Sequence, residues 1–116
     1  MTLAELIHAY CGETGAPFLA TRPITPITGM NREYVGFYSP RIRDGRPGMG
    51  LIYIHPDFRQ HGHATRAAEA FREKHPDMSW YAAEHDMISR HLAEKIGLTQ
   101  QEDYEYNGIT YLVYYA

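Results

Sequence analysis

The stretch from Leu51 to Ala64 constrains the fold of this chain more than any other part of the sequence. An apolar, strand-like segment runs into Pro56 and a loop of small residues, and from Gly62 onward apolar residues recur at helical spacing. The amides at the start of a helix point the same way, and the helix dipole adds positive partial charge there. We therefore expect this loop to bind an anion, and specifically a phosphate ester.

The common nucleotide-binding motifs do not fit this loop. The lysine and Ser/Thr of the pattern G-x-x-x-x-G-K-[ST] are absent, which argues against a kinase or a GTPase. The dinucleotide pattern G-x-G-x-x-G is also missing, because Gly45, Gly48 and Gly50 precede a strand rather than a helix. Gly62 instead permits a tight turn, and Ala64 leaves the approach to the helix clear for a phosphate.

Helical and strand-like patterns alternate along the rest of the chain. We expect a helix over residues 2–11, strands over 33–39, 49–55 and 79–83, helices from Gly62 to Pro76 and from Asp86 to Gly97, and a hairpin around Asn107-Gly108. Pro17 to Thr21 has the composition of a short strand, and residues 23–31 are expected to form a loop. This order predicts a mixed sheet flanked by helices, in one α/β domain over residues 1–116.

Local signals place several of these boundaries. Thr2 and Glu5 have the spacing of a capping box, and Gly12 is expected to end the first helix. Asp86 is expected to cap the last helix, either as a simple N-cap or as a cofactor contact as well. The turn at Asp44-Gly45 predicts a hairpin with a long tip, and its arginines form either a solvated loop or an anion site; they are Arg41, Arg43 and Arg46.

Composition excludes several classes of protein. The chain has 11 Lys and Arg against 14 Asp and Glu, a net charge of −3, so we expect no nucleic-acid partner. No apolar run is long enough to cross a bilayer and no leader pattern opens the chain, so we expect no membrane association. Cys11 is the single cysteine, which fits a cytoplasmic location and rules out an internal disulfide.

Seven histidines invite a metal hypothesis, since His55, His61 and His63 cluster around the loop. Their spacing matches no common zinc signature, and Asp57 is the sole acidic residue at motif spacing. We therefore expect no metal site.

Arg59-Gln60-His61-Gly62-His63-Ala64 matches the pattern R/Q-x-x-G-x-G/A, and here the chain resembles the GNAT superfamily of N-acetyltransferases. Ile54-His55-Pro56 stands where that family has V-x-P. The family's downstream helix pattern is matched in part by Asp86, Ser89, Leu92, Ala93, Lys95, Gly97 and Leu98. The resemblance covers about residues 49–116. It implies a GNAT-like, mixed but mostly antiparallel sheet with a shortened N-terminal region.

The resemblance implies that the chain uses acetyl-CoA as a cosubstrate. Loop amides would hold the pyrophosphate, and backbone groups of Tyr53 and Ile54 would bind the pantetheine arm between two splayed strands. The acetyl carbonyl would then lie near the strand at residues 79–84. The implied cofactor-binding residues are Tyr53, Ile54, Arg59, Gln60, His61, Gly62, His63, Ala64, Thr65, Asp86 and Ser89.

The implied activity is N-acetyl transfer, in which a primary amine attacks the thioester directly. The family's general-acid tyrosine falls on Ala93, and no glutamate stands on the strand before Pro56. Glu84 and His85 are then the candidate catalytic residues, with His91 or Tyr81 as alternatives.

A second interpretation uses the same fold without turnover. A GNAT-like module whose proton-transfer groups are lost would bind CoA or a protein partner as a scaffold or sensor. Under either interpretation, the short N-terminal region leaves the acceptor side open to a large acceptor or to the second subunit of a homodimer.

Overall fold

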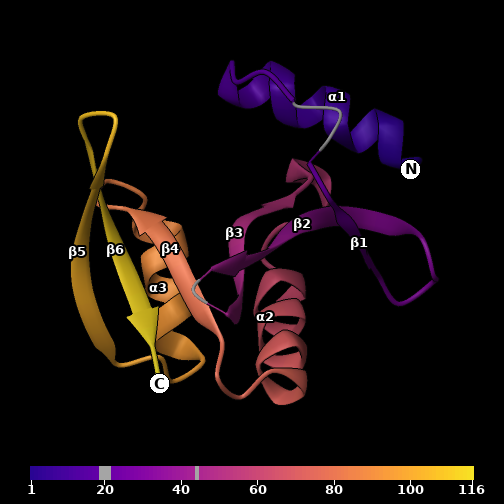
Figure 1. The fold of residues 1–116 in the computed structure, drawn as a ribbon. Helices are drawn as coiled ribbons and strands as arrows, with labels where there is room; N and C mark the ends of the chain where they lie inside the picture. Colours follow the sequence, from indigo (N-terminus) through magenta and orange to yellow (C-terminus); the bar gives the residue numbers. More distant parts are fainter. Residues whose placement is uncertain (19–21, 44) are drawn as a thin grey trace.

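The computed structural model describes residues 1–18, 22–43 and 45–116, which form three α-helices, one short 3-10 helix and one sheet. In chain order the elements are α1 (Leu3–Thr14), β1 (Thr25–Thr28), β2 (Tyr34–Arg43), β3 (Arg46–Ile54), η1 (Pro56–Phe58), α2 (His63–Lys74), β4 (Ser79–Ala83), α3 (Met87–Lys95), β5 (Gln100–Tyr106) and β6 (Ile109–Tyr115) (Figure 1). The strand order is β1-β2-β3-β4-β6-β5. Every neighbouring pair is antiparallel except β3 and β4. The predicted mixed, mostly antiparallel sheet flanked by helices is confirmed.

A bulge interrupts β3 in its middle. Ser39 of β2 pairs with Leu51 and the next residue, Pro40, pairs with Met49, so that Gly50 is an extra residue on β3. A bulge of this kind bends its strand and reverses the face to which the following side chains point. Met49 accordingly belongs to the core on the α2 and α3 side, whereas Leu51 packs on the α1 side.

The same point is where β3 leaves β4. The parallel pair is in register only at Gly48 and Met49, although β3 continues to Ile54 and β4 to Ala83 (Figure 1). Beyond the bulge, no described strand pairs with the β4-facing edge of β3. The splayed strands that the resemblance implies are therefore present.

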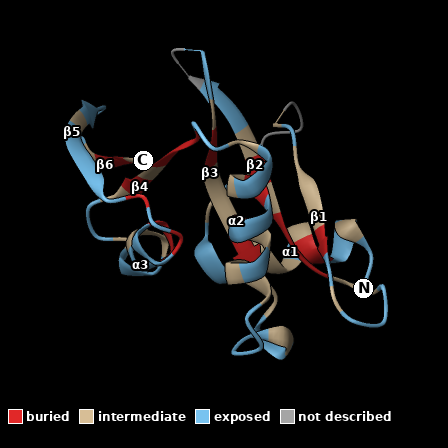
Figure 2. Cartoon of the chain, turned by 90° about the horizontal axis from the view of Figure 1, so that it is seen from below, coloured by how far each residue is buried: buried red, intermediate tan, exposed pale blue. Residues whose placement is uncertain are grey.

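Each face of the sheet carries its own core. On one face α1 packs on β2 and β3, where Leu6, Phe37 and Tyr53 are buried together. On the other face α2 and α3 enclose a larger cluster around the fully buried ring of Trp80. Figure 2 shows the buried segments on the strands and on the inner sides of the helices. In the described part of the chain, no helix is both long and apolar enough to cross a membrane.

The first helix has the predicted capping box but a different end. The Thr2 hydroxyl accepts from the Glu5 amide at 3.1 Å, and the Thr2 amide donates to the Glu5 carboxylate at 2.9 Å. The predicted stop at Gly12 is wrong, because the helix continues to Thr14 and ends at Gly15, which adopts φ 71° and donates to the Cys11 carbonyl. One glycine inside a helix is tolerated, and the added turn carries the chain toward β3.

Strand β1 occupies part of the predicted loop 23–31, so that prediction is wrong for Thr25–Thr28. Pro26 lies opposite Phe37, whose backbone groups point toward β3, so the proline nitrogen faces the open edge, where no donor is needed. The predicted strand from Pro17 to Thr21 lies partly outside the described residues, and its first two residues are not in a strand.

The β2–β3 hairpin is longer and tighter than predicted. Arg41 and Arg46 lie in paired strands rather than in a long loop, and the Arg46 guanidinium lies 5.8 Å from the Tyr115 ring centroid. Asp44 lies outside the described residues. The predicted long tip is therefore wrong, and an anion site at its arginines stays a prediction.

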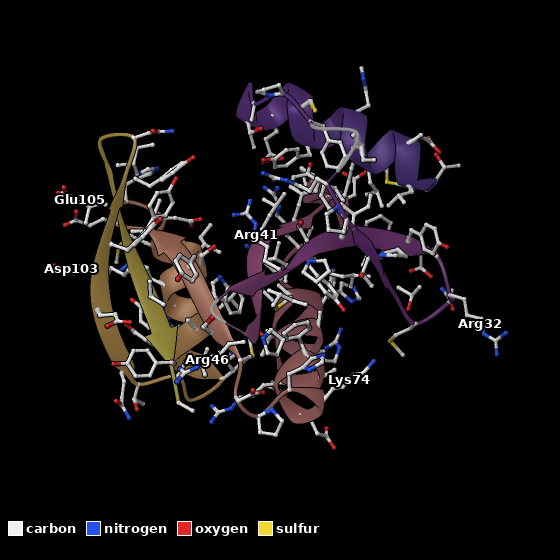
Figure 3. The ribbon with its side chains drawn as sticks, viewed as in Figure 1. Arg32, Arg41, Arg46, Lys74, Asp103 and Glu105 are labelled. Atoms are coloured by element: carbon white, nitrogen blue, oxygen red, sulfur yellow. The ribbon has the colours of Figure 1, made fainter. Side chains whose placement is uncertain are left out.

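The C-terminal hairpin turn is confirmed, since Asn107 and Gly108 have φ of 52° and 77°, as a type I′ turn requires. Its first arm, β5, is the far edge of the sheet and carries the exposed acidic side chains of Asp103 and Glu105 (Figure 3). Like charges of this kind oppose pairing with a second copy of the same edge.

Candidate functional site

A groove of about 790 Å³ runs along the open edge of β3, between α1 on one side and the start of α2 and one side of α3 on the other. The groove brings together nine of the eleven residues predicted to bind a cofactor: Tyr53, Ile54, Arg59, Gln60, Gly62, His63, Ala64, Thr65 and Asp86. His61 and Ser89 are not among the residues that line it. The lining residues that the sequence interpretation did not place at the site are Tyr10, Glu13, Thr14, Leu51, Ile52, Phe58, Ile88, Leu92 and Lys95.

The start of α2 forms one end of the groove. Gly62 stands at the N-cap with φ 76° and Gln60 has φ 68°, so two residues of the loop are left-handed. No side chain of a described residue caps this helix, and the first bond within it is donated by Arg66 to the Gly62 carbonyl. The amides of the first turn are therefore left for a ligand. Binding of an anion at these amides stays a prediction.

The open edge of β3 forms the floor of the groove. The His55 amide donates to the Val35 carbonyl at 2.9 Å. This bond shows which residues of β3 direct their backbone groups toward β2. Because backbone groups alternate along a strand, those of Tyr53 point to β2, whereas those of Ile52 and Ile54 point into the groove. The prediction that the Tyr53 backbone faces the ligand is therefore wrong. Ile52 takes that place, and Tyr53 lines the groove with its side chain.

A polar cluster joins α1 to the loop. Arg59 Nη2 donates to both carboxylate oxygens of Glu13 at 2.8 Å, and Arg59 Nε donates to the Ile54 carbonyl at 2.9 Å. The Tyr53 hydroxyl donates to Glu13 Oε1 at 3.1 Å, and the Arg59 guanidinium lies 5.6 Å from the centroid of the Tyr53 ring. In this structure Arg59 holds α1 against β3 rather than pointing to the amides of α2.

These contacts change the acidity of both partners. The Arg59 hydrogen bond lowers the pKa of the Glu13 carboxyl, so this group is anionic at neutral pH. Burial, followed by the neighbouring Glu13 carboxylate, raises the pKa of Tyr53 to about 12. The tyrosine therefore keeps its proton over the whole range in which the protein would work.

Asp86 performs the N-cap role that its sequence position predicts. Its Oδ1 accepts from the Ser89 amide at 3.1 Å, so the carboxylate caps α3 while also lining the groove. Ala93, which stands where the family has its tyrosine, is fully buried in the core around Trp80. That position supplies no proton donor to the groove.

The candidate catalytic pair lies outside the groove. Glu84 and His85 are both exposed in the turn that follows β4, and neither lines the groove. The Glu84 backbone is held by two bonds, from its amide to the Thr110 carbonyl and from Arg90 Nη1 to its own carbonyl, both at 2.9 Å. The alternative residues His91 and Tyr81 are also absent from the lining. An acid–base role for any of them stays a prediction.

The histidines around the loop make local contacts. His55 Nδ1 accepts from the Asp57 amide at 3.1 Å, and Arg66 Nη2 lies 3.0 Å from His63 Nδ1. Burial and the nearby Arg66 charge lower the pKa of His63, which favours its neutral form. Within residues 1–18, 22–43 and 45–116, no three His, Cys, Asp or Glu side chains are grouped so that they could hold a metal ion.

Comparisons with known proteins address the fold. A scan against protein-family models and a search of curated protein sequences found no match. Among solved structures, a GNAT-family acetyltransferase from Bacillus cereus ATCC 10987 superposes with a TM-score of 0.74 at 14% identity, over 100% of this chain and 92% of the other. Apo-form YjaB from Escherichia coli has a TM-score of 0.66 at 18% identity, over 97% and 90%.

A third structure, the NatC complex bound to Gag peptide and CoA, matches with a TM-score of 0.65 at 12% identity, over 96% of this chain and 87% of the matched one. At these identities the likeness establishes the fold. The chain therefore has the GNAT-like fold that the resemblance implies.

Proposed function

We propose that this protein is an acyl-CoA-dependent N-acyltransferase that moves an acetyl group from acetyl-CoA to a primary amine. The observation that carries the proposal is the uncapped start of α2 beside the open edge of β3, both facing one groove. Two of the structural neighbours support it, since one is an acetyltransferase of the GNAT family and the other, the NatC complex, has CoA bound.

The groove offers a complementary surface for two parts of the cosubstrate, the diphosphate and the pantetheine arm. The first-turn amides of α2 and the positive end of its dipole suit a diphosphate. The peptide groups of Ile52 and the amide of Ile54 point into the groove and suit the amide-bearing pantetheine arm, which would pair with β3 as an added strand. The Ile54 carbonyl points the same way and accepts from Arg59 Nε in this structure. Ile88 and Leu92 of α3 add apolar lining next to these polar groups.

The reaction balances without a further reagent. The amine nitrogen attacks the thioester carbonyl carbon, the new C–N bond forms, and the C–S bond breaks. The sulfur leaves as a thiolate and ends as the thiol of CoA, taking up the proton that the nitrogen loses. Holding the amine beside the thioester supplies much of the rate by proximity, so the reaction does not depend on a tyrosine at position 93. We retain Glu84 and His85 as candidates for the proton acceptor.

A non-catalytic module is the second candidate function. It is favoured by the buried Ala93 and by the absence of Glu84 and His85 from the groove lining. Such a module would bind CoA in the same groove and transfer nothing.

Two measurements test the proposal. Calorimetric titration with CoA is expected to give saturable one-to-one binding. Release of free thiol from acetyl-CoA, followed colorimetrically across a panel of primary amines, is expected to rise above the amine-free rate for at least one amine. Binding without turnover across the panel would support the module instead. Absence of CoA binding would overturn both functions.

A further inference from the structure

The groove contains two carboxylates, and they are used differently. Asp86 is occupied in capping α3, where its oxygen accepts the Ser89 amide at 3.1 Å. Glu13 reaches the groove from α1 and has its charge neutralised by Arg59 through two bonds of 2.8 Å. Nothing in the helix of Glu13 requires this carboxylate, since α1 already has its own capping box at Thr2 and Glu5.

We propose that Glu13 is the specificity residue for the acceptor amine, and that binding of the diphosphate makes it available by drawing Arg59 away. The inference rests on the proposed function and deepens it. The acceptor is a primary amine that binds as its cationic ammonium form and releases one proton to water before its nitrogen attacks the thioester. CoA would bind first and the amine second.

The ion pair is weak enough to exchange. The side chains of Arg59 and Glu13 remain 42% and 39% exposed, and solvent screens an ion pair of that exposure. Arg59 directly precedes the left-handed residue Gln60, so its side chain is anchored in the same loop as the amides proposed to bind the diphosphate. A diphosphate carries more negative charge than one carboxylate and accepts a guanidinium in the same bidentate way.

Release of Arg59 leaves Glu13 as an anion that needs a new cation. The Tyr53 hydroxyl stays in place at 3.1 Å and holds one carboxylate oxygen, because the tyrosine ring is buried between α1 and β3. The other oxygen then faces the groove. An ammonium group satisfies both its charge and its remaining hydrogen-bonding capacity. Loading of the cosubstrate would thereby create the acceptor site.

The first test measures CoA affinity by calorimetry in the wild type, in Glu13→Gln and in Glu69→Gln. Glu69 is an exposed glutamate of α2 outside the groove, so its variant controls for the change in net charge. Removing the competitor for Arg59 is expected to tighten CoA binding about three-fold to five-fold in Glu13→Gln, with no change in the control. Equal affinity in Glu13→Gln and wild type would overturn the exchange.

The second test asks whether Glu13 acts through Arg59. In an Arg59→Gln background, the added Glu13→Gln change is expected to leave the CoA affinity unaltered, because no guanidinium remains to be freed. If the double variant still binds CoA three-fold to five-fold more tightly than Arg59→Gln, the gain in affinity is a general charge effect. The proposed exchange of Arg59 between Glu13 and the diphosphate is then wrong.

The third test measures the acceptor with the most reactive amine of the panel. Glu13→Gln is expected to raise KM for the amine about ten-fold with little change in kcat. The same substitution is expected to tighten CoA binding, so its effects on the two substrates are opposite. An unchanged KM would remove Glu13 from acceptor recognition. Wild-type protein that binds no CoA would instead refute the proposed function, so the two failures are distinguishable. If CoA binds and no amine reacts, the acceptor role fails and the first two tests still decide the exchange.

Discussion

Helices α2 and α3 lie on the same face of the sheet and begin in opposite ways. Helix α3 begins at Asp86, whose carboxylate accepts an amide of its first turn at 3.1 Å. Helix α2 begins at Gly62, with φ 76° and no side-chain cap from any described residue. A capped start contributes stability, whereas a bare start keeps its amides available for a ligand. The two helices therefore differ in what their first-turn amides bind, although both pack in the core around Trp80 and both line the groove.

The largest effect is expected when the bare start is blocked. Gly62→Val forces a β-branched residue to adopt φ 76°, and its Cβ would lie 2.9 Å from Arg66 Nη1. We expect the loop to shift and CoA affinity to fall at least about 50-fold, as measured by calorimetry.

Gly12→Ala is the matched control, because Gly12 is helical and nothing lies within 4 Å of the added Cβ. This variant is expected to keep its CoA affinity and to melt at a slightly higher temperature. Full CoA binding by Gly62→Val would show that the start of α2 is not a phosphate site.

Removing the cap of α3 should reduce stability rather than ligand binding. Asp86→Ala is expected to lower the free energy of unfolding by about 1 kcal/mol, measured by urea titration, because the Ser89 amide loses its acceptor. Asp86→Asn keeps an acceptor and is expected to stay within about 0.5 kcal/mol of the wild type. An Asn variant as unstable as the Ala variant would mean that the carboxylate does more than cap.

The capping box of α1 gives a smaller effect. Thr2→Ala removes the hydroxyl that accepts the Glu5 amide, at an exposed helix end next to the chain terminus. We expect the free energy of unfolding to fall by about 0.5 kcal/mol and CoA affinity to stay constant. A loss of CoA affinity here would indicate that α1 contributes to the cofactor side of the groove more directly than its contacts imply.

The smallest effect concerns acid pH. Because Arg59 lowers the pKa of Glu13 in the folded state, the stabilisation by this pair is present at neutral pH and is lost as the pH falls from the ordinary value of 4.5 through the lowered one. A carbon-13 NMR titration of Glu13 is expected to show a low pKa in the wild type and a higher one in Arg59→Gln, where the Tyr53 hydrogen bond remains. The same titration curve in both proteins would place Glu13 away from Arg59 in solution.

Much of the site was predictable because its parts are close in sequence. The left-handed Gly62, the uncapped helix after it and the strand before Pro56 fall within one short stretch. The bulge at Gly50 was not predictable, because it is defined by which residues of β2 lie opposite. Nor was it predictable that the backbone groups of Ile52, rather than those of Tyr53, face the groove. Which residues of β3 bond to β2 depends on how the two strands are paired.

The sequence by itself determined those features whose interactions span a few residues. Examples are the capping box at Thr2, the cap at Asp86 and the turn at Asn107-Gly108, where backbone dihedrals and neighbouring amides decide the outcome. Tertiary structure alone decided that Glu13 meets Arg59, 46 residues away, across the open edge of β3. No local pattern encodes such a contact, because it exists only once α1 has packed its apolar face on the sheet and closed one wall of the groove.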